Sequence, residues 1–183
     1  MSEQIKRIER KLIQKGSIID FYKDSIQLPD GKVVQWDFIK HKGAAAVVAV
    51  RDDGRLLMVR QYRNALERYT LELPAGGRDS EDEPTLQCAA RELEEETGYK
   101  SDDLTHLLTL RTTVAFCDEL IDVYVAKNLK PSKQRLDEGE YINVEAYTID
   151  ELCEMVFAKE IQDSKTVSAI MAYKLSLITE NKE

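Results

Sequence analysis

The sequence predicts an α/β or α+β sandwich in which helices pack on a mixed sheet. Three observations predict this class. Strand-like apolar patterns fill most of the chain up to residue 73, a sharply bounded amphipathic helix is expected at 84–97, and two more helices are expected after residue 147. The chain has 183 residues, of which 43% are hydrophobic, which suits one compact domain with a small N-terminal extension.

The N-terminal segment is expected to form two or three antiparallel strands. Residues 5–41 alternate apolar and polar side chains and are interrupted at Lys15-Gly16 and at Pro29-Asp30-Gly31. So few strands do not fold alone and should bury one face on another surface. We therefore divide the chain into N-terminal strands at 1–42 and a main domain at 43–183.

The central strands follow. Residues 43–50, GAAAVVAV, form a continuous apolar run of the kind covered on both faces, and Asp52-Asp53-Gly54 turns it into a strand at 55–62. A short strand at 69–73 leads into the helix at 84–97. The remaining expected elements are strands at 104–114, 120–126 and 141–146, helices at 148–157 and 159–177, and a polar loop at 128–139.

The helix at 84–97 has clear boundaries and two different faces. Pro84 suits the first helical position, and Gly98 suits a left-handed C-cap. One face should pack on the core, and its residues are Leu86, Ala89, Ala90, Leu93 and Thr97. The other face carries Glu92, Glu95 and Glu96, with Arg91 placed to pair with Glu95. Such an acidic face is most often solvated surface, but three neighbouring carboxylates also suit a hard divalent cation.

Charge and composition exclude several kinds of partner. Acidic residues outnumber basic ones, 34 to 26, with a net charge of −8 and a pI near 5.0, which argues against nucleic acid or an anionic membrane. The longest apolar run is too short to cross a bilayer. The odd number of cysteines favours a reducing, cytoplasmic setting. With only two histidines, oxygen ligands point to Mg²⁺ or Mn²⁺ rather than zinc.

The spacing around the acidic helix adds a resemblance to a known family. The order is Gly77, five residues, Glu83, seven residues, Arg91-Glu92-Leu93, one residue, Glu95-Glu96, one residue, and Gly98-Tyr99. This pattern resembles the Nudix box of hydrolases that act on nucleoside diphosphates linked to another group, with Tyr99 where an aliphatic residue is usual. The segments LPDGK at 28–32, VRQYR at 59–63, ELPAG at 72–76 and FCDE at 116–119 are similar to the ADP-ribose pyrophosphatase branch.

The resemblance implies an α/β/α sandwich with a mixed central sheet and a homodimer that exchanges its N-terminal strands. It also implies that Glu92, Glu96 and the carbonyl of Ala75 bind Mg²⁺, with Glu95 either a ligand or a group held by Arg91. The catalytic base of this branch comes from a loop after the helix. Glu138 is our first candidate for that base, and Glu140 is the alternative or an extra metal ligand; a merely solvated loop also remains open.

The resemblance further suggests how the substrate is held. Arg60 or Arg63 is expected to bind the phosphates or the terminal ribose, and strand alternation allows at most one of them to point inward. Trp36 could stack on adenine, although core or interface packing explains it equally well.

The expected activity is metal-dependent hydrolysis of a nucleotide sugar, with ADP-ribose cleaved to AMP and ribose 5-phosphate. Residues 113–116, TVAF, stand where the ADP-ribose branch has a Pro-Gly-Phe-like turn. GDP-mannose and other nucleotide sugars are therefore the alternative substrates. A non-catalytic module that binds ADP-ribose is the alternative from a different class.

Overall fold

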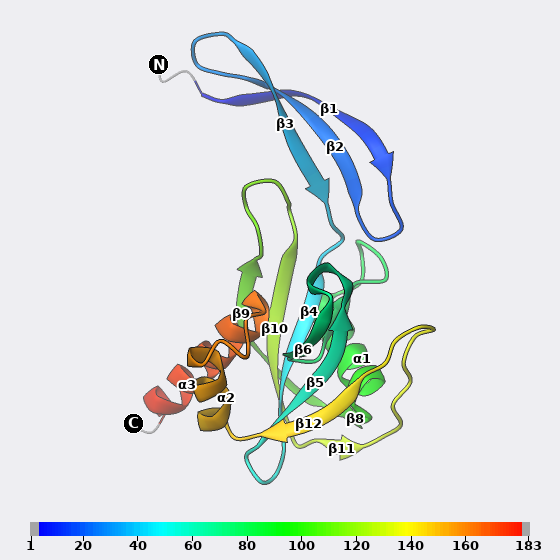
Figure 1. Ribbon diagram of the computed structural model, residues 1–183, viewed down its shortest axis with the longest axis vertical. Helices are drawn as coiled ribbons and strands as arrows, with labels where there is room; N and C mark the ends of the chain where they lie inside the picture. Colours follow the sequence, from blue (N-terminus) through cyan, green and yellow to red (C-terminus); the bar gives the residue numbers. More distant parts are fainter. Residues whose placement is uncertain (1–3, 181–183) are drawn as a thin grey trace. The chain divides into compact units, whose positions relative to one another are not determined.

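The computed structural model describes residues 4–180 and confirms the mixed α/β sandwich (Figure 1). By their contacts, residues 1–43 and 111–120 form one unit, and residues 44–110 and 121–183 form another. The elements are β1 (Lys6–Lys15), β2 (Asp20–Gln27), β3 (Val33–Lys40), β4 (Ala44–Val50), β5 (Leu56–Arg63), a 3₁₀ turn (Asn64–Leu66), β6 (Arg68–Glu72), β7 (Ala75–Gly77), α1 (Thr85–Thr97), β8 (Tyr99–Lys100), β9 (Asp103–Arg111), β10 (Leu120–Lys127), β11 (Lys130–Pro131), β12 (Asn143–Tyr147), α2 (Ile149–Phe157) and α3 (Ser164–Glu180).

The first unit is an antiparallel three-stranded sheet in the order β1-β2-β3, as the turn signals predicted. Its buried charge is Asp24, which accepts two hydrogen bonds from Arg10 at 2.7 and 2.6 Å. The unit also includes residues 111–120, which we had assigned to the main domain. The backbone N–H of Ile39 donates to the carbonyl of Phe116 at 2.7 Å, so this distant segment lies along the end of β3.

The second unit is built on a seven-stranded sheet in the order β12-β5-β4-β10-β9, with β6 beside β5 and β7 beside β4. The β4–β10 pair is parallel, whereas β5 runs antiparallel to β4, β6 and β12, so the sheet is mixed. Helix α1 covers one face and helices α2 and α3 cover the other. The predicted α/β/α layering is confirmed.

Strand β4 explains why both faces are covered. Val47 points to the face that Leu93 of α1 covers, and Val48 points to the face that Leu152 of α2 and Ile170 of α3 cover. All of these side chains are fully buried. A continuous apolar run is what a strand between two helical layers requires. Strand β4 therefore fixes the position of α1 against the sheet.

Helix α1 begins one residue later than expected. Pro84 occupies the N-cap with an extended backbone, and Thr85 is the first helical residue. The side chain of Thr85 donates to Asp122 of β10 at 2.7 Å, which ties the start of the helix to the sheet. Gly98 ends the helix with a φ of 72°, in the left-handed region that glycine adopts without strain, as predicted.

The packing face of α1 differs from the expected one at two positions. Leu86, which we expected on the packing face, is 46% exposed, whereas Cys88, which was not part of that expected face, is fully buried. The helix is rotated so that the Cys88 thiol donates to the carbonyls of Gly76 and Gly77 at 3.5 and 3.4 Å. Because the side chain of Cys88 is small, the loop before α1 can lie directly on the helix.

The C-terminal helices are confirmed, and both boundaries of the last helix are shifted from the expected 159–177. Thr148 caps α2 in a capping box with Glu151. Helix α3 starts at residue 164 and not at 159, because Lys159 turns the chain with a φ of 65° and Asp163 accepts the N–H of Thr166 at 3.0 Å. The predicted polar loop contains the short strand β11, paired with β8. Within residues 4–180, no helix combines the length and apolar character needed to cross a bilayer.

We predict that replacing Leu93 by Ala lowers the free energy of unfolding by about 2 to 5 kcal/mol, because it opens a cavity between α1 and the sheet. Leu86→Ala, on the same helix, should cost less than about 1 kcal/mol because that side chain is half-exposed. Urea unfolding followed by circular dichroism measures both values. Equal losses would contradict this orientation of α1.

Candidate active site

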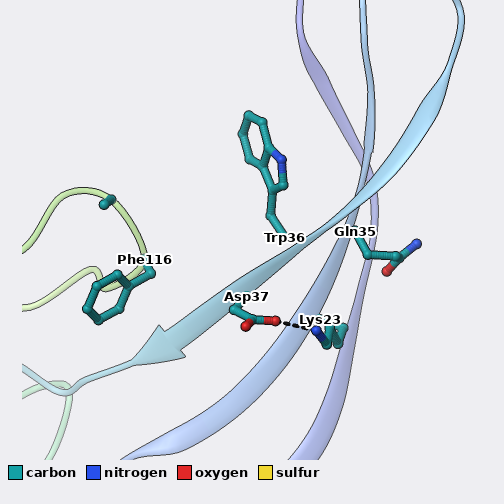
Figure 2. Close-up of a pocket in the computed structure, with 6 residues that line it drawn as sticks. Lys23, Gln35, Trp36, Asp37 and Phe116 are labelled. Carbon is teal, nitrogen blue, oxygen red and sulfur yellow. Dashed lines mark ion pairs between the residues drawn. The ribbon is translucent and has the colours of Figure 1, made fainter.

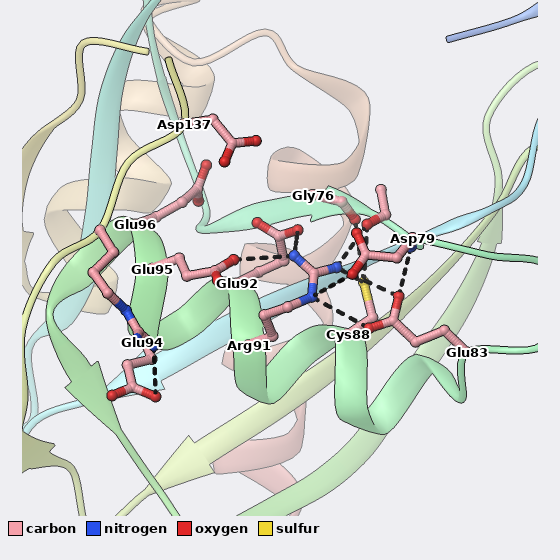
Figure 3. A network of polar contacts seen from close by, with 12 residues as sticks. Gly76, Asp79, Glu83, Cys88, Arg91, Glu92, Glu94, Glu95, Glu96 and Asp137 are labelled. Carbon is pink, nitrogen blue, oxygen red and sulfur yellow. Dashed lines mark hydrogen bonds and ion pairs between the residues drawn. The ribbon is translucent and has the colours of Figure 1, made fainter. Parts of the chain in front are cut away.

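An acidic cavity of about 160 Å³ lies in the second unit, between the Gly-containing strand β7, the polar face of α1 and the loop before β12 (Figure 3). Eight of the residues that line it have acidic or basic side chains and come from α1 and the loops. The lining residues are Ala75, Gly76, Gly77, Asp79, Arg91, Glu92, Glu95, Glu96, Arg135, Asp137 and Glu140. The structure thus brings together Ala75, the three helix glutamates and one of the two candidate bases.

Arg91 holds one side of the cavity together (Figure 3). Its guanidinium donates to Glu92 at 2.6 Å and to Glu95 at 3.1 Å, as the i, i+4 spacing predicted for the second pair. It also donates to the carbonyl of Gly77 at 2.9 Å and to Glu83 at 3.2 Å. Glu83 in turn accepts the N–H of Asp79 at 2.7 Å, so it orients the loop before the helix. Arg91 therefore links the loop to the acidic face.

Glu96 and Glu92 are the most deeply buried acids of the cavity. Glu96 is 4% exposed and accepts the backbone N–H of Ala75 at 2.8 Å. Burial raises the pKa of Glu96 to about 8, against the Ala75 hydrogen bond, and repulsion from Glu92 and Glu140 adds to the rise. Burial likewise raises the pKa of Glu92 to about 7, although Arg91 opposes it. Both carboxylates therefore lie where a positive ion would be strongly favoured.

Gly76 sits directly on the acidic face. A Cβ at this position would overlap the carboxylate of Glu92, whereas a Cβ at Gly77 would meet nothing within 4 Å. A side chain at residue 76 would therefore force the Glu92 carboxylate to move from its present position. Cys88 fills the space below, and burial raises the pKa of its thiol to about 12, so it is a filler and not a nucleophile.

The acidic loop before β12 contributes Asp137 and Glu140 to the cavity, while Glu138 is not among the lining residues. Glu140 acts on both Glu92 and Glu96 electrostatically. Arg135 also lines the cavity and lies 3.7 Å from Glu94. Sequence spacing gave no signal for Arg135, because its position depends on how the loop returns over α1.

The two candidate arginines point to different places. Arg60 forms a fork with Glu145 of β12, at 2.5 and 3.1 Å. Arg63 forms a fork with Glu72 at 2.8 and 2.7 Å, and the charge of Glu96 acts on it. The arginines therefore separate as strand alternation predicted, and Arg63 is the one within electrostatic reach of the acidic cavity.

Trp36 belongs to the first unit and lines a separate cavity of about 430 Å³ there (Figure 2). Phe116 lines the same cavity, and both rings are about half exposed. Lys23 and Asp37 form an ion pair beside them. Exposed aromatic faces next to polar groups suit a planar ring with hydrogen-bonding edges.

The residues of the acidic cavity fit a divalent cation in their chemistry. The candidate ligand atoms are oxygens, the type that Mg²⁺ and Mn²⁺ prefer. The raised pKa values of Glu92 and Glu96 show that the protein alone does not fully compensate their ionised forms. In the described part of the chain no three acidic, histidine or cysteine side chains converge on one ion position, since Arg91 engages Glu92 and Glu95. These two carboxylates would have to exchange the guanidinium for the ion.

Comparisons with known proteins give the family. The family model for the NUDIX domain matches residues 40–169. The chain is 40% identical over 172 residues to the ADP-ribose pyrophosphatase of Bacillus subtilis (strain 168), which covers 93% of this chain and 92% of the relative. It is 36% identical over 179 residues to the methanol dehydrogenase activator of Bacillus methanolicus, covering 97% and 96%. The chain therefore belongs to the Nudix family of hydrolases.

A solved structure supports the fold. The crystal structure of an ADP compounds hydrolase matches with a TM-score of 0.86 and covers 100% of this chain and 99% of its own. At 20% sequence identity, this similarity shows a shared fold and no more.

We predict that Gly76→Ala weakens Mn²⁺ binding at least about tenfold, because the new methyl group displaces the Glu92 carboxylate. Gly77→Ala is the matched control and should bind Mn²⁺ with nearly unchanged affinity, because its Cβ meets open space. Electron paramagnetic resonance of free Mn²⁺ measures both affinities. Equal affinity in the two variants would show that Glu92 does not hold the ion.

We also predict a pH-dependent contribution from Glu72. Burial raises its pKa, but hydrogen bonds from Arg63 and the charge of Lys165 outweigh burial and lower the pKa from 4.5 to about 2. Because the folded pKa lies below the unfolded one, this contribution is present above about pH 4.5 and is lost as the pH falls towards 2. It amounts to on the order of 3 kcal/mol at neutral pH.

Urea unfolding between pH 7 and pH 3 tests this contribution. The stability of the wild type should fall more steeply below pH 4.5 than that of Glu72→Gln, which has no carboxyl group to protonate. Parallel curves for the two proteins would contradict the low pKa.

Proposed function

We propose that this protein is a Mg²⁺-dependent pyrophosphatase that cleaves ADP-ribose to AMP and ribose 5-phosphate, with Mn²⁺ as a second usable ion. The observation that carries the proposal is the acidic cavity, which Glu92, Glu95 and Glu96 of the Nudix helix line together with Glu140. The similarity to ADP-ribose pyrophosphatases over nearly the whole chain supports the substrate.

The proposed metal ligands are Glu92, Glu96 and the carbonyl of Ala75. Glu95 serves as a further ligand or stays with Arg91. A bound divalent ion would neutralise the diphosphate and make a water molecule more acidic. When the ion is bound, the role of Arg91 is to hold Glu83 and the Gly77 carbonyl, which keeps the loop closed over the helix.

For the base, the acidic loop at 137–140 remains the source, and the cavity favours Glu140 over our first candidate Glu138. Glu140 faces the reacting region, whereas Glu138 does not line it. A base must reach the water that attacks phosphorus, so proximity decides between two residues of the same chemistry.

Arg63 is the proposed phosphate-binding arginine. It is near enough to the acidic cavity to interact with Glu96, while Arg60 is engaged with Glu145 and Tyr147.

Trp36, with Phe116, is the proposed stacking surface for adenine. An unchanged KM for ADP-ribose in Trp36→Ala would remove this assignment.

A homodimer is the proposed assembly, because the N-terminal strands expose many apolar side chains that need a covering surface. These residues are Ile5, Ile8, Leu12, Ile13, Ile18, Ile19 and Val33. Light scattering should give twice the chain mass of 21.0 kDa, and a monomer would refute the dimer.

The cytoplasmic location stays a proposal, supported by the three cysteines, which form no disulfide among the described residues.

Two alternatives differ in their outcome. Hydrolysis of GDP-mannose or another nucleotide sugar keeps the chemistry and changes the base or the sugar that is recognised. A non-catalytic role, in which the chain binds ADP-ribose or regulates a partner, would need no base or metal ligands. The full set of acidic residues in the cavity favours catalysis.

The deciding experiment incubates the purified protein with ADP-ribose and Mg²⁺ and follows AMP by chromatography, with EDTA as the control. We expect AMP and ribose 5-phosphate to form only with the metal. Faster turnover of GDP-mannose in a parallel reaction would reassign the substrate. Binding of ADP-ribose without turnover would favour the regulatory role.

We predict that Glu140→Gln lowers kcat by about 10²- to 10⁴-fold, the usual contribution of a general base, with little change in Mn²⁺ affinity. Glu138→Gln is the matched control from the same loop and should keep most of the activity. Steady-state kinetics with ADP-ribose measures both variants. The opposite order would restore Glu138 as the base, and two active variants would move the base elsewhere.

A further inference from the structure

A second group of charged residues is buried behind the acidic cavity, at the start of α3, and has no role so far. Glu72 is 2% exposed, Lys165 is 8% exposed and Thr166 is fully buried. Glu72 ends strand β6, three residues before Ala75, while Lys165 and Thr166 come from a helix more than 90 residues later. The fold therefore brings a distant helix to the turn that borders the cavity.

Glu72 is fully engaged by hydrogen-bond donors. Its two oxygens accept from Nε and Nη2 of Arg63, from the hydroxyl of Thr70 at 2.7 Å and from Nζ of Lys165 at 2.5 Å. A fork through Nε and Nη2 fixes the plane of the guanidinium and directs the Nη1 donors away from Glu72. The Arg63 side chain remains 41% exposed, so these donors can reach a ligand.

Lys165 completes the arrangement. Its ammonium group also donates to Asp163 at 3.0 Å, so it bridges the carboxylates of β6 and the α3 start. Burying such an ion pair is costly, and well-packed apolar residues often stabilise a core equally well. The charges of Lys165 and Arg63 both interact with Glu96. The pair contributes to stability, and its interaction with Glu96 also suits a role in the geometry of the neighbouring site.

Thr166 connects the same helix to the backbone of the turn. Its hydroxyl accepts the N–H of Leu73 at 3.1 Å and donates to Asp163 at 2.6 Å. Two residues further along, the N–H of Ala75 donates to Glu96. Two hydrogen bonds to the backbone of the same turn, at Leu73 and Ala75, thus connect it to the start of α3 and to the acidic face of α1.

We propose that Lys165 and Glu72 are positioning residues that hold Arg63 in the orientation in which its Nη1 binds the diphosphate of the substrate. This inference rests on the proposed function, because it assumes a diphosphate ligand at the acidic cavity. Lys165 itself does not touch the substrate and acts through Glu72 and Arg63. A purely structural ion pair would stabilise the fold without affecting substrate binding.

A double-mutant cycle tests the inference. The variants of the cycle are Lys165→Met, Arg63→Gln and the double variant. Lys165→Arg is the conservative variant. Lys174→Met is the control, because Lys174 lies on the same helix and pairs with Asp150 instead. The measurements are the Kd of ADP-ribose by calorimetry in EDTA, KM and kcat with Mg²⁺, and the urea midpoint.

We expect Lys165→Met to raise Kd and KM for ADP-ribose about tenfold or more, because the arginine loses its orientation. In the Arg63→Gln background the same change should have almost no further effect, since coupled residues are not additive. Lys165→Arg should restore most of the affinity, and Lys174→Met should leave it unchanged. If Lys165→Met does not fold, Glu72→Gln takes its place in the cycle.

Additive effects in the cycle, or a lower urea midpoint with unchanged Kd and KM, would overturn the inference and leave the proposed function intact. A wild-type protein that neither binds nor cleaves ADP-ribose would overturn the proposed function and this inference with it. Strong coupling in Kd together with normal turnover of ADP-ribose by the wild type supports both.

Discussion

The structure depends on one constraint, which is the burial of negative charge on the inner edge of helix α1. Glu92 and Glu96 lie where burial and mutual repulsion raise their pKa values to about 7 and 8. Two neighbouring groups reduce the cost of that burial. Arg91 pairs with Glu92, and the N–H of Ala75 donates to Glu96. The partial compensation leaves a site that favours a cation, which is the physical basis of a metal-dependent diphosphate hydrolase.

The rest of the second unit positions this charge. Strand β4 is buried on both faces and fixes α1 on one side of the sheet and α2 with α3 on the other. Gly76 lets the loop lie on Glu92, and Cys88 fills the space below it. The start of α3 reaches the same turn through Thr166. A helix that closes the opposite face of the sheet thereby also contributes to the geometry of the site.

Local signals predicted the elements well, and contacts between distant segments were harder to predict. The apolar run at 43–50, the glycine at 98 and the helix start near residue 148 were each indicated by a few neighbouring residues, and all three were confirmed. The predicted helix face was partly wrong. The periodic pattern grouped Leu86 with Ala89 and Leu93, whereas the contact of Cys88 with the β7 loop buries Cys88 and leaves Leu86 half exposed.

For the candidate site, too, local features could be predicted from the sequence and contacts between distant segments could not. The spacing of the helix glutamates was visible in the sequence, whereas the positions of Glu140, Arg135 and Lys165 depend on how later segments return to α1 and β6. The segment 111–120 likewise joins the N-terminal strands through a hydrogen bond between Ile39 and Phe116 that no local pattern indicates. Such contacts are specified by the whole fold and not by neighbouring residues.

The most direct test of this account is the Mg²⁺-dependent turnover of ADP-ribose by Glu96→Gln, measured together with its circular dichroism. The substitution keeps the size of the side chain and removes the charge that the account assigns to the metal. We predict a folded protein without detectable metal-dependent turnover. Near-normal activity in a folded Glu96→Gln protein would contradict the claim that this buried carboxylate holds the ion.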